Sequence, residues 1–160
     1  MVIQALRGAA VAVFLALGAP AAADAPPADA VEPAARGAAA AVDAFHAALR
    51  RGDTKAALAL LDGEALIFEE GRSERSRAEY ALQHLKAEAE VSKVVRGETV
   101  RRRGAAAGDM AWIATEGRTR GRYRGTQVNR VTDETMVLRR AGDAWKIVHI
   151  HWSSAESSVE

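Results

Sequence analysis

Apolar residues recur with helical spacing in the first half of the chain, beyond residue 36. The clearest case places Val42, Phe45 and Leu49 on one face, at positions i, i+3 and i+7. Glycines or N-terminal capping residues bound each segment of this kind, as is typical of short amphipathic helices. The pattern predicts three helices, over residues 37–51, 53–61 and about 77–90.

Alternation of apolar and polar residues, the pattern of strands, occurs once at residues 64–70 and dominates the chain after residue 90. Glycine-containing turns separate the later strands, so they form an antiparallel meander. We place these strands at about 91–103, 109–118, 126–139 and 144–153. Helices followed by consecutive strands indicate an α+β fold. Three helices packed on a strongly bent antiparallel sheet would enclose a cone-shaped core.

The first 23 residues have the pattern of a secretory signal peptide. Arg7 precedes an uninterrupted apolar run, Ala9 to Leu17, which is too short to span a bilayer. Small residues then permit cleavage after Ala23. We therefore expect a periplasmic or secreted protein. The predicted organisation is a signal peptide (1–23), an Ala/Pro-rich linker (24–36), a domain (37–155) and a disordered tail (156–160).

The charge of the chain is balanced, with 22 lysines and arginines against 21 aspartates and glutamates. Removal of Arg7 with the signal peptide leaves equal numbers, so we expect neither nucleic acid nor, after cleavage, a membrane as partner. The basic run Arg101–Arg103 is interpreted as a solvated strand end. The chain has no cysteine, which excludes disulfides and thiolate metal sites. Phosphate-loop, nucleophile-elbow and zinc-protease motifs are also missing, and no cofactor is expected.

Three stretches carry a resemblance to a known family. They are the helical opening that ends at Arg51-Gly52-Asp53 and leads to Leu66-Ile-Phe-Glu69, the segment Asp133–Leu138, and the last strand Trp145–Ser153 with its His-x-His pair. Residues 38 to 154 thereby resemble the nuclear transport factor 2-like superfamily. Within it they are most similar to the SnoaL-like branch that includes the association domain of calcium/calmodulin-dependent protein kinase II. The resemblance implies a cone-shaped fold, a pocket and an oligomer.

The resemblance implies no particular reaction. Trp152 stands where the association domain has one of its pocket arginines, and Arg118 and Arg130 are out of phase with the others. The catalytic aspartate of the cyclases and isomerases has no clear counterpart in this sequence. A cluster of arginines that binds a carboxylate is therefore not expected.

Two histidines of the last strand are the weak catalytic candidates. His149 and His151 lie at i and i+2, so both point to the same side. Strict alternation places them on one face with Trp145 and Ile147, while Trp152 lies on the other. They are interpreted as structural or interface residues, as polar groups of a pocket, or as ligands of a metal. A metal site would need a third ligand, and nothing in the spacing of the sequence requires one to be present. No metal is therefore predicted.

Other strand residues complete the predicted ligand-binding set. Trp112 either lines the pocket or packs in the core, and Arg130 and Glu134 form either a solvated pair or a polar anchor at the pocket mouth. Helix residues receive less weight: His46 lies at the edge of an apolar face, and Tyr80 and His84 are expected to point away from the core. The predicted set is Trp112, Arg130, Glu134, His149, His151 and Trp152.

We expect an exported domain that binds a small molecule in the pocket of the cone. It should associate with itself through its sheet, as a homodimer or a higher homo-oligomer, because an exposed curved sheet with apolar residues on both faces needs a cover. The alternative is a small isomerase, cyclase or hydrolase that uses a strand histidine as general acid and base.

Overall fold

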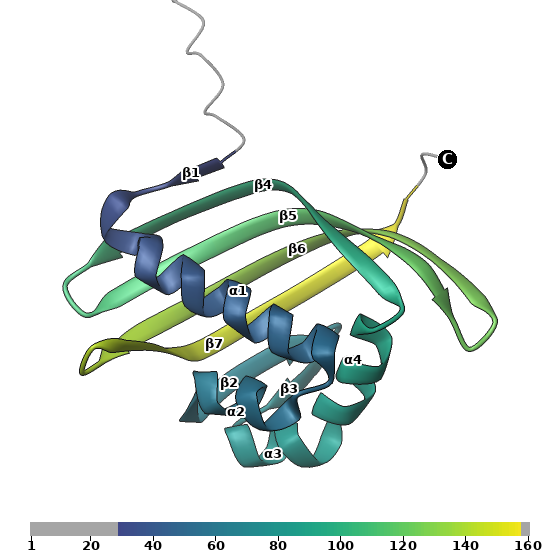
Figure 1. Cartoon of the computed structure of the whole chain (residues 1–160), viewed down its shortest axis with the longest axis horizontal. Coiled ribbons are helices and arrows are strands. Elements are labelled where there is room, and N and C mark those ends of the chain that lie inside the picture. The colour runs from purple at the N-terminus through teal and green to yellow at the C-terminus, as the bar shows by residue number, and fades with distance from the viewer. Residues whose placement is uncertain (1–28, 158–160) are drawn as a thin grey trace, which may run out of the picture.

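A curved sheet and the helices on its concave side build the fold, which we describe from a computed structural model for residues 29–157 (Figure 1). The elements are β1 (Asp29–Val31), a 3-10 turn η1 (Pro33–Ala35), α1 (Arg36–Arg51), α2 (Thr54–Leu60), β2 (Leu61–Glu69), β3 (Arg72–Glu74), α3 (Arg77–Gln83), α4 (Leu85–Ser92), β4 (Val95–Ala107), β5 (Met110–Tyr123), β6 (Thr126–Ala141) and β7 (Ala144–Glu156). The expected α+β fold is confirmed. No helix in this part of the chain has the length and apolar character needed to cross a membrane.

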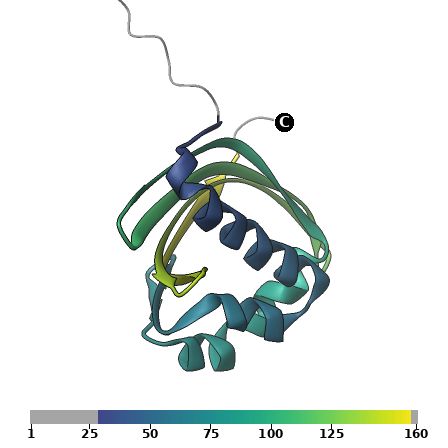
Figure 2. The same cartoon turned by 60° about the vertical axis from the view of Figure 1, so that its left-hand side comes forward.

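The seven strands lie in the order β1-β4-β5-β6-β7-β2-β3. Strands β4 to β7 form the expected antiparallel meander, and β2 pairs in parallel with β7. Figure 2 shows the sheet curving around α1 without closing. The apolar face of α1 packs into this hollow, where Val42 and Phe45 are fully buried with Ile113, Met136 and Ile150 of the sheet.

The described residues of the predicted linker, 29–36, form regular structure. Residues 29–31 pair in parallel with β4, and Ala35 is fully buried. Strand pairing uses backbone groups, so a short Ala-rich segment can cover the edge of β4 without any pattern of side chains. Pro33 then starts η1, where its missing N–H costs nothing. The predicted signal peptide, residues 24–28 of the predicted linker and residues 158–160 of the predicted tail lie outside the described residues.

The third predicted helix is broken at His84 into α3 and α4. The Ser76 hydroxyl caps α3 as expected, accepting the backbone N–H of Glu79. The break changes the faces, however: Tyr80 is fully buried, whereas Leu82, which a straight helix would bury, is 88% exposed. The predicted faces came from a helical wheel, which assumes that residues 77–90 share one helix axis. Because α3 and α4 are separate helices, that assumption does not hold.

A β-bulge in β7 decides which residues of the last strand face the helices. Val137 pairs with His149 but Leu138 pairs with Ile147, which leaves Val148 as the extra residue. The bulge shifts the alternation by one residue. Trp145 and Ile147 are buried before it, and Ile150 is buried after it. His149 and His151 therefore face away from the helices, on the opposite side from Ile147.

The close approach of β4 to β5 requires a residue without a side chain at position 121. A Cβ atom added to Gly121 would lie 2.5 Å from the Val94 carbonyl oxygen and 2.8 Å from the Cα of Val95. Backbone atoms cannot move aside, so we expect Gly121→Ala to destabilise the fold by about 1–3 kcal/mol. Gly97, on the partner strand, has nothing within 4 Å of such a Cβ and is the matched control. Urea unfolding of both alanine variants tests this, and equal midpoints would contradict it.

Candidate functional site

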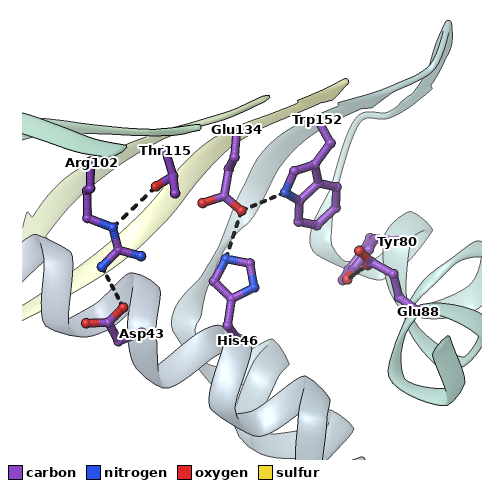
Figure 3. A network of polar contacts seen from close by, with 8 residues as sticks. All are labelled: Asp43, His46, Tyr80, Glu88, Arg102, Thr115, Glu134 and Trp152. Atoms are coloured by element: carbon purple, nitrogen blue, oxygen red, sulfur yellow. Dashed lines mark hydrogen bonds and ion pairs between the residues drawn. The ribbon is translucent and has the colours of Figure 1, made fainter. Parts of the chain in front are cut away.

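A cavity of about 790 Å³ lies in the hollow of the sheet, between α1, α4 and strands β4 to β7. Its size is in the range of small-molecule sites in proteins. The walls carry many ionisable side chains beside apolar ones such as Leu49 and Val91. These polar side chains form three groups, and within each group the side chains contact one another (Figure 3).

The first group joins α1 to the two last strands. Nε2 of His46 lies 2.8 Å from Oε2 of Glu134, and the indole N–H of Trp152 donates to the same oxygen at 2.7 Å. The side chain of Glu134 is 9% exposed. Burial alone would raise the pKa of Glu134, but His46 and Trp152 outweigh it and hold that pKa below its usual range.

His46 is the counterpart of this carboxylate. Burial alone would lower the pKa of His46, but the charge of Glu134 and the hydrogen bond to it outweigh burial and raise that pKa. The other ring nitrogen, Nδ1, makes no hydrogen bond within residues 29–157, and the His46 side chain is 30% exposed. In Figure 3 this nitrogen is on the side where Tyr80 and Glu88 lie. It is therefore free to contact a molecule in the cavity.

The second group is a neutral acid beside a buried tyrosine. The hydroxyl of Tyr80 donates to Oε2 of Glu88, which lines the cavity. Burial raises the pKa of Glu88 to about 8, and the nearby Glu69 carboxylate adds to the effect although the bond from Tyr80 opposes it. Burial also raises the pKa of Glu69. At neutral pH most Glu88 side chains therefore keep their proton.

The third group contains an arginine that sequence reasoning placed at a solvated strand end. Nη1 of Arg102 lies 2.7 Å from Oδ1 of Asp43, and its Nε donates to the Thr115 hydroxyl at 3.3 Å. The Arg102 side chain is only 14% exposed and lines the cavity. A bulge at Val100 shifts the alternation of β4, so Arg102 points inward while its neighbours in the basic run do not.

Two of the predicted ligand-binding residues, Glu134 and Trp152, line this cavity. Arg130 shares the inner face with Glu134 as expected but lies at the end of the sheet. There its guanidinium donates to the Ser154 hydroxyl at 2.9 Å and to Glu70 at 3.1 Å. Trp112 lies on the outer face of β5 and is 41% exposed, so it contributes neither to the pocket nor to the core.

The structure places His149 and His151 on the outer face of the sheet as well. Nδ1 of His149 lies 2.8 Å from the Leu66 carbonyl oxygen, and both imidazoles pack edge-on against Phe68. Neither lines the cavity, because of the bulge at Val148. No group of three potential metal ligands is present in the described part of the chain. The histidines that line the cavity are instead His46 and His84.

The pair of His46 and Glu134 should make stability depend on pH. Folding raises the pKa of His46, so the stabilisation that it brings is complete below the unfolded pKa, near 6.5, and is lost as pH rises through the folded pKa. We therefore expect the difference in unfolding free energy between wild type and His46→Gln to be larger at pH 6 than at pH 9. Urea unfolding at both values measures it. A difference that does not change with pH would contradict the charged pair.

Comparison with known proteins places this geometry in a family. Residues 38–157 match the model of the SnoaL-like domain. The chain belongs to the SnoaL-like domain family. A solved structure of a proposed ketosteroid isomerase from Shewanella frigidimarina NCIMB 400 is 33% identical, with a TM-score of 0.72, and the match covers 78% of this chain and all of that one.

More distant solved structures share the fold. A proposed calcium/calmodulin-dependent protein kinase II association domain from Xanthomonas campestris is 19% identical, with a TM-score of 0.67 and coverage of 78% of this chain and 89% of that one. A proposed dehydratase of the nuclear transport factor 2-like family from Streptomyces avermitilis is 20% identical, with a TM-score of 0.63 and coverage of 78% and 98%. Among curated proteins no match was found. The expected family resemblance is thereby confirmed.

Proposed function

We propose that this SnoaL-like domain binds a small polar molecule in its cavity and moves a proton on it with His46. The observation that carries the proposal is the 2.8 Å contact between His46 and Glu134 inside the cavity. A carboxylate in this position fixes the orientation of the imidazole and stabilises the imidazolium that forms when the ring takes a proton. The catalytic histidine of the proposal is thus on α1, not on the last strand.

Glu88 supplies the complementary group. Its protonated carboxyl, bonded to Tyr80, can donate a hydrogen bond to an oxygen atom of the bound molecule. An imidazole whose basicity Glu134 increases and a carboxyl group that keeps its proton suit isomerisation or dehydration of a carbonyl compound. The similarity to a proposed ketosteroid isomerase and a proposed dehydratase supports this class of reaction.

The lining of the cavity favours a polar substrate over a steroid. Four arginines, two histidines and six carboxylates border it. A rigid hydrocarbon would remove water from these groups without replacing its hydrogen bonds, and each buried polar group left unpaired costs about 1–3 kcal/mol. A small oxo acid or hydroxy ketone offers oxygen atoms to the same groups.

Exchange of carbon-bound protons in D₂O tests the catalytic proposal directly. Acetoacetate, pyruvate and dihydroxyacetone are incubated with the protein, and NMR follows the loss of the signals of protons next to the carbonyl group. We expect acceleration by the wild type and a decrease of about 10²–10⁴-fold in His46→Gln. His149→Gln, on the outer face, is the matched control and should behave as wild type. Acceleration that survives His46→Gln would refute the role of His46.

We propose in addition that the protein is exported and pairs with a second copy through the outer face of its sheet. The pattern of residues 1–23 supports export, and an N-terminus at Asp24 in protein from a bacterial periplasm is the expected finding. The exposed apolar side chains of Phe68, Met110 and Trp112 support self-association. Light scattering should report a dimer that Trp112→Glu dissociates. A monomeric wild type at high concentration would exclude this interface.

A further inference from the structure

The outer face of β5 changes character along the strand. Side chains at even positions point away from the helices, since Ala111 and Ile113 at odd positions are buried. The even positions begin with the exposed apolar residues Met110 and Trp112. They end with three exposed arginines, Arg118, Arg120 and Arg122. One end of the outer face is therefore apolar and the other basic.

The neighbouring strand adds a fourth guanidinium to the basic end. Arg96 of β4 is exposed and lies directly opposite Arg120 in the strand pairing. Alternate residues of a strand are about 7 Å apart and neighbouring strands about 4.8 Å, so the four side chains form a two-dimensional array. We call this set, Arg96, Arg118, Arg120 and Arg122, the arginine array. Three of its members, Arg118, Arg120 and Arg122, belong to the part of β5 that leads into the β5–β6 hairpin, and Figure 1 shows this hairpin projecting beyond the helices.

The four arginines lack the ion pairs that other surface arginines have. Arg101 pairs with Glu116, Arg124 with Glu90 and Arg139 with Asp62. No member of the arginine array forms an ion pair within residues 29–157, even though Glu98 stands opposite Arg118 in the register. The net charge of +1 thus conceals a local excess of positive charge. Like charges held side by side without partners repel, and an anionic partner relieves that repulsion.

The shape and composition of this surface identify the class of anion. Of the array only Arg118 borders the cavity of the candidate site. The other three arginines are exposed on the outer surface, which suits a flat field of phosphates. Single-stranded nucleic acid is bound with aromatic side chains on which bases stack, and the outer face near the array carries none in the described strands. Instead Val131, which pairs with Arg118, is 41% exposed. An apolar side chain among arginines suits the boundary between headgroups and acyl chains.

We propose that the arginine array binds the phosphate headgroups of an anionic lipid bilayer. The near-zero net charge led us to expect no membrane partner. Net charge is a sum over the whole chain, however, and it does not show that the fold gathers positive charges on one part of the surface. The array is also unsuited to self-association, since two copies paired through it would bring eight guanidinium groups together. It therefore leaves the apolar end of the outer face to a second copy.

Sedimentation with vesicles tests the proposal on the full chain. Vesicles that contain phosphatidylglycerol are compared with vesicles of phosphatidylcholine alone, which report any binding through the apolar run at residues 9–17. We expect the triple variant Arg96→Gln, Arg120→Gln, Arg122→Gln to lose about 100-fold in partition to the anionic vesicles, because each guanidinium near such a surface contributes about five-fold. Arg118 stays unchanged because it also borders the cavity.

The matched control removes three positive charges from the helices. Arg51, Lys55 and Lys86 are exposed and form no ion pair within the described residues, so their triple Gln variant has the same net charge as the array variant. This control variant should bind to anionic vesicles nearly as strongly as wild type. Equal losses in the two variants would show that net charge alone matters and would overturn the proposal. Tighter binding to a single-stranded oligonucleotide than to anionic vesicles would overturn it as well.

Discussion

Phe45→Ala is expected to destabilise the fold by about 3–5 kcal/mol, the range for removal of a large aromatic side chain from a core. Phe45 is fully buried at the centre of α1. Its ring lies 6.4 Å from that of Trp152, nearly parallel, and 5.7 Å from the imidazole of His46, edge to face. The alanine would leave a void beside the two side chains that hold Glu134. The variant should therefore lose ligand binding together with stability.

Urea unfolding followed by circular dichroism measures the effect of this substitution. Phe45→Leu is the control, because leucine retains most of the buried apolar volume and should cost much less. Ala44, which lies next to Phe45 but is exposed, provides a second comparison through Ala44→Ser, which should change the midpoint little. A Phe45→Ala protein as stable as wild type would show that the hollow of the sheet does not depend on this ring.

Glu134→Leu is expected to cost about 3–5 kcal/mol, because removal of one member of a buried pair leaves the other without compensation. Two donors lose their acceptor at once: Nε2 of His46 and the indole N–H of Trp152. The substitution also removes the carboxylate that orients the proposed base. Proton exchange in the cavity should therefore fall to the level of His46→Gln.

A double-mutant cycle separates the pair from its surroundings. Glu134→Leu, His46→Leu and the double variant are unfolded under the same conditions, and the coupling energy is the departure from additivity. We expect the double variant to be more stable than additivity requires, since it leaves no unpaired imidazole. Glu134→Gln, which keeps an accepting oxygen but loses the negative charge, should lie between wild type and Glu134→Leu. Strict additivity would show that the two side chains do not stabilise each other.

The order and type of the helices and strands could be predicted from the sequence, because each element is specified by the spacing of several apolar residues. The spacing of Val42, Phe45 and Leu49 predicted α1, and alternation with glycine turns predicted the meander. Two of the groups in the cavity, Glu134 and Trp152, were also predicted. Alternation did not decide which face of the last strand lines the pocket, because both faces of that strand are half apolar.

The rest of the site depends on single-residue irregularities that alternation does not reveal. The extra residue at Val148 moves His149 to the outer face, and the one at Val100 turns Arg102 inward. The break at His84 buries Tyr80 against Glu88. His46 offered a signal that was available from the sequence: it lies four residues after the buried Val42, on the side of α1 that faces the sheet.

The position of β7 in the sheet has a consequence for when this protein can fold. It is the last strand in the sequence, yet it lies between β6 and β2 and joins β2 and β3 to the rest of the sheet. Leu66 meets its partner His149 only after 83 further residues have been synthesised. The hollow around α1 therefore cannot close until β7 has been synthesised. A sheet that closes late suits the proposed export by a route that carries unfolded polypeptides.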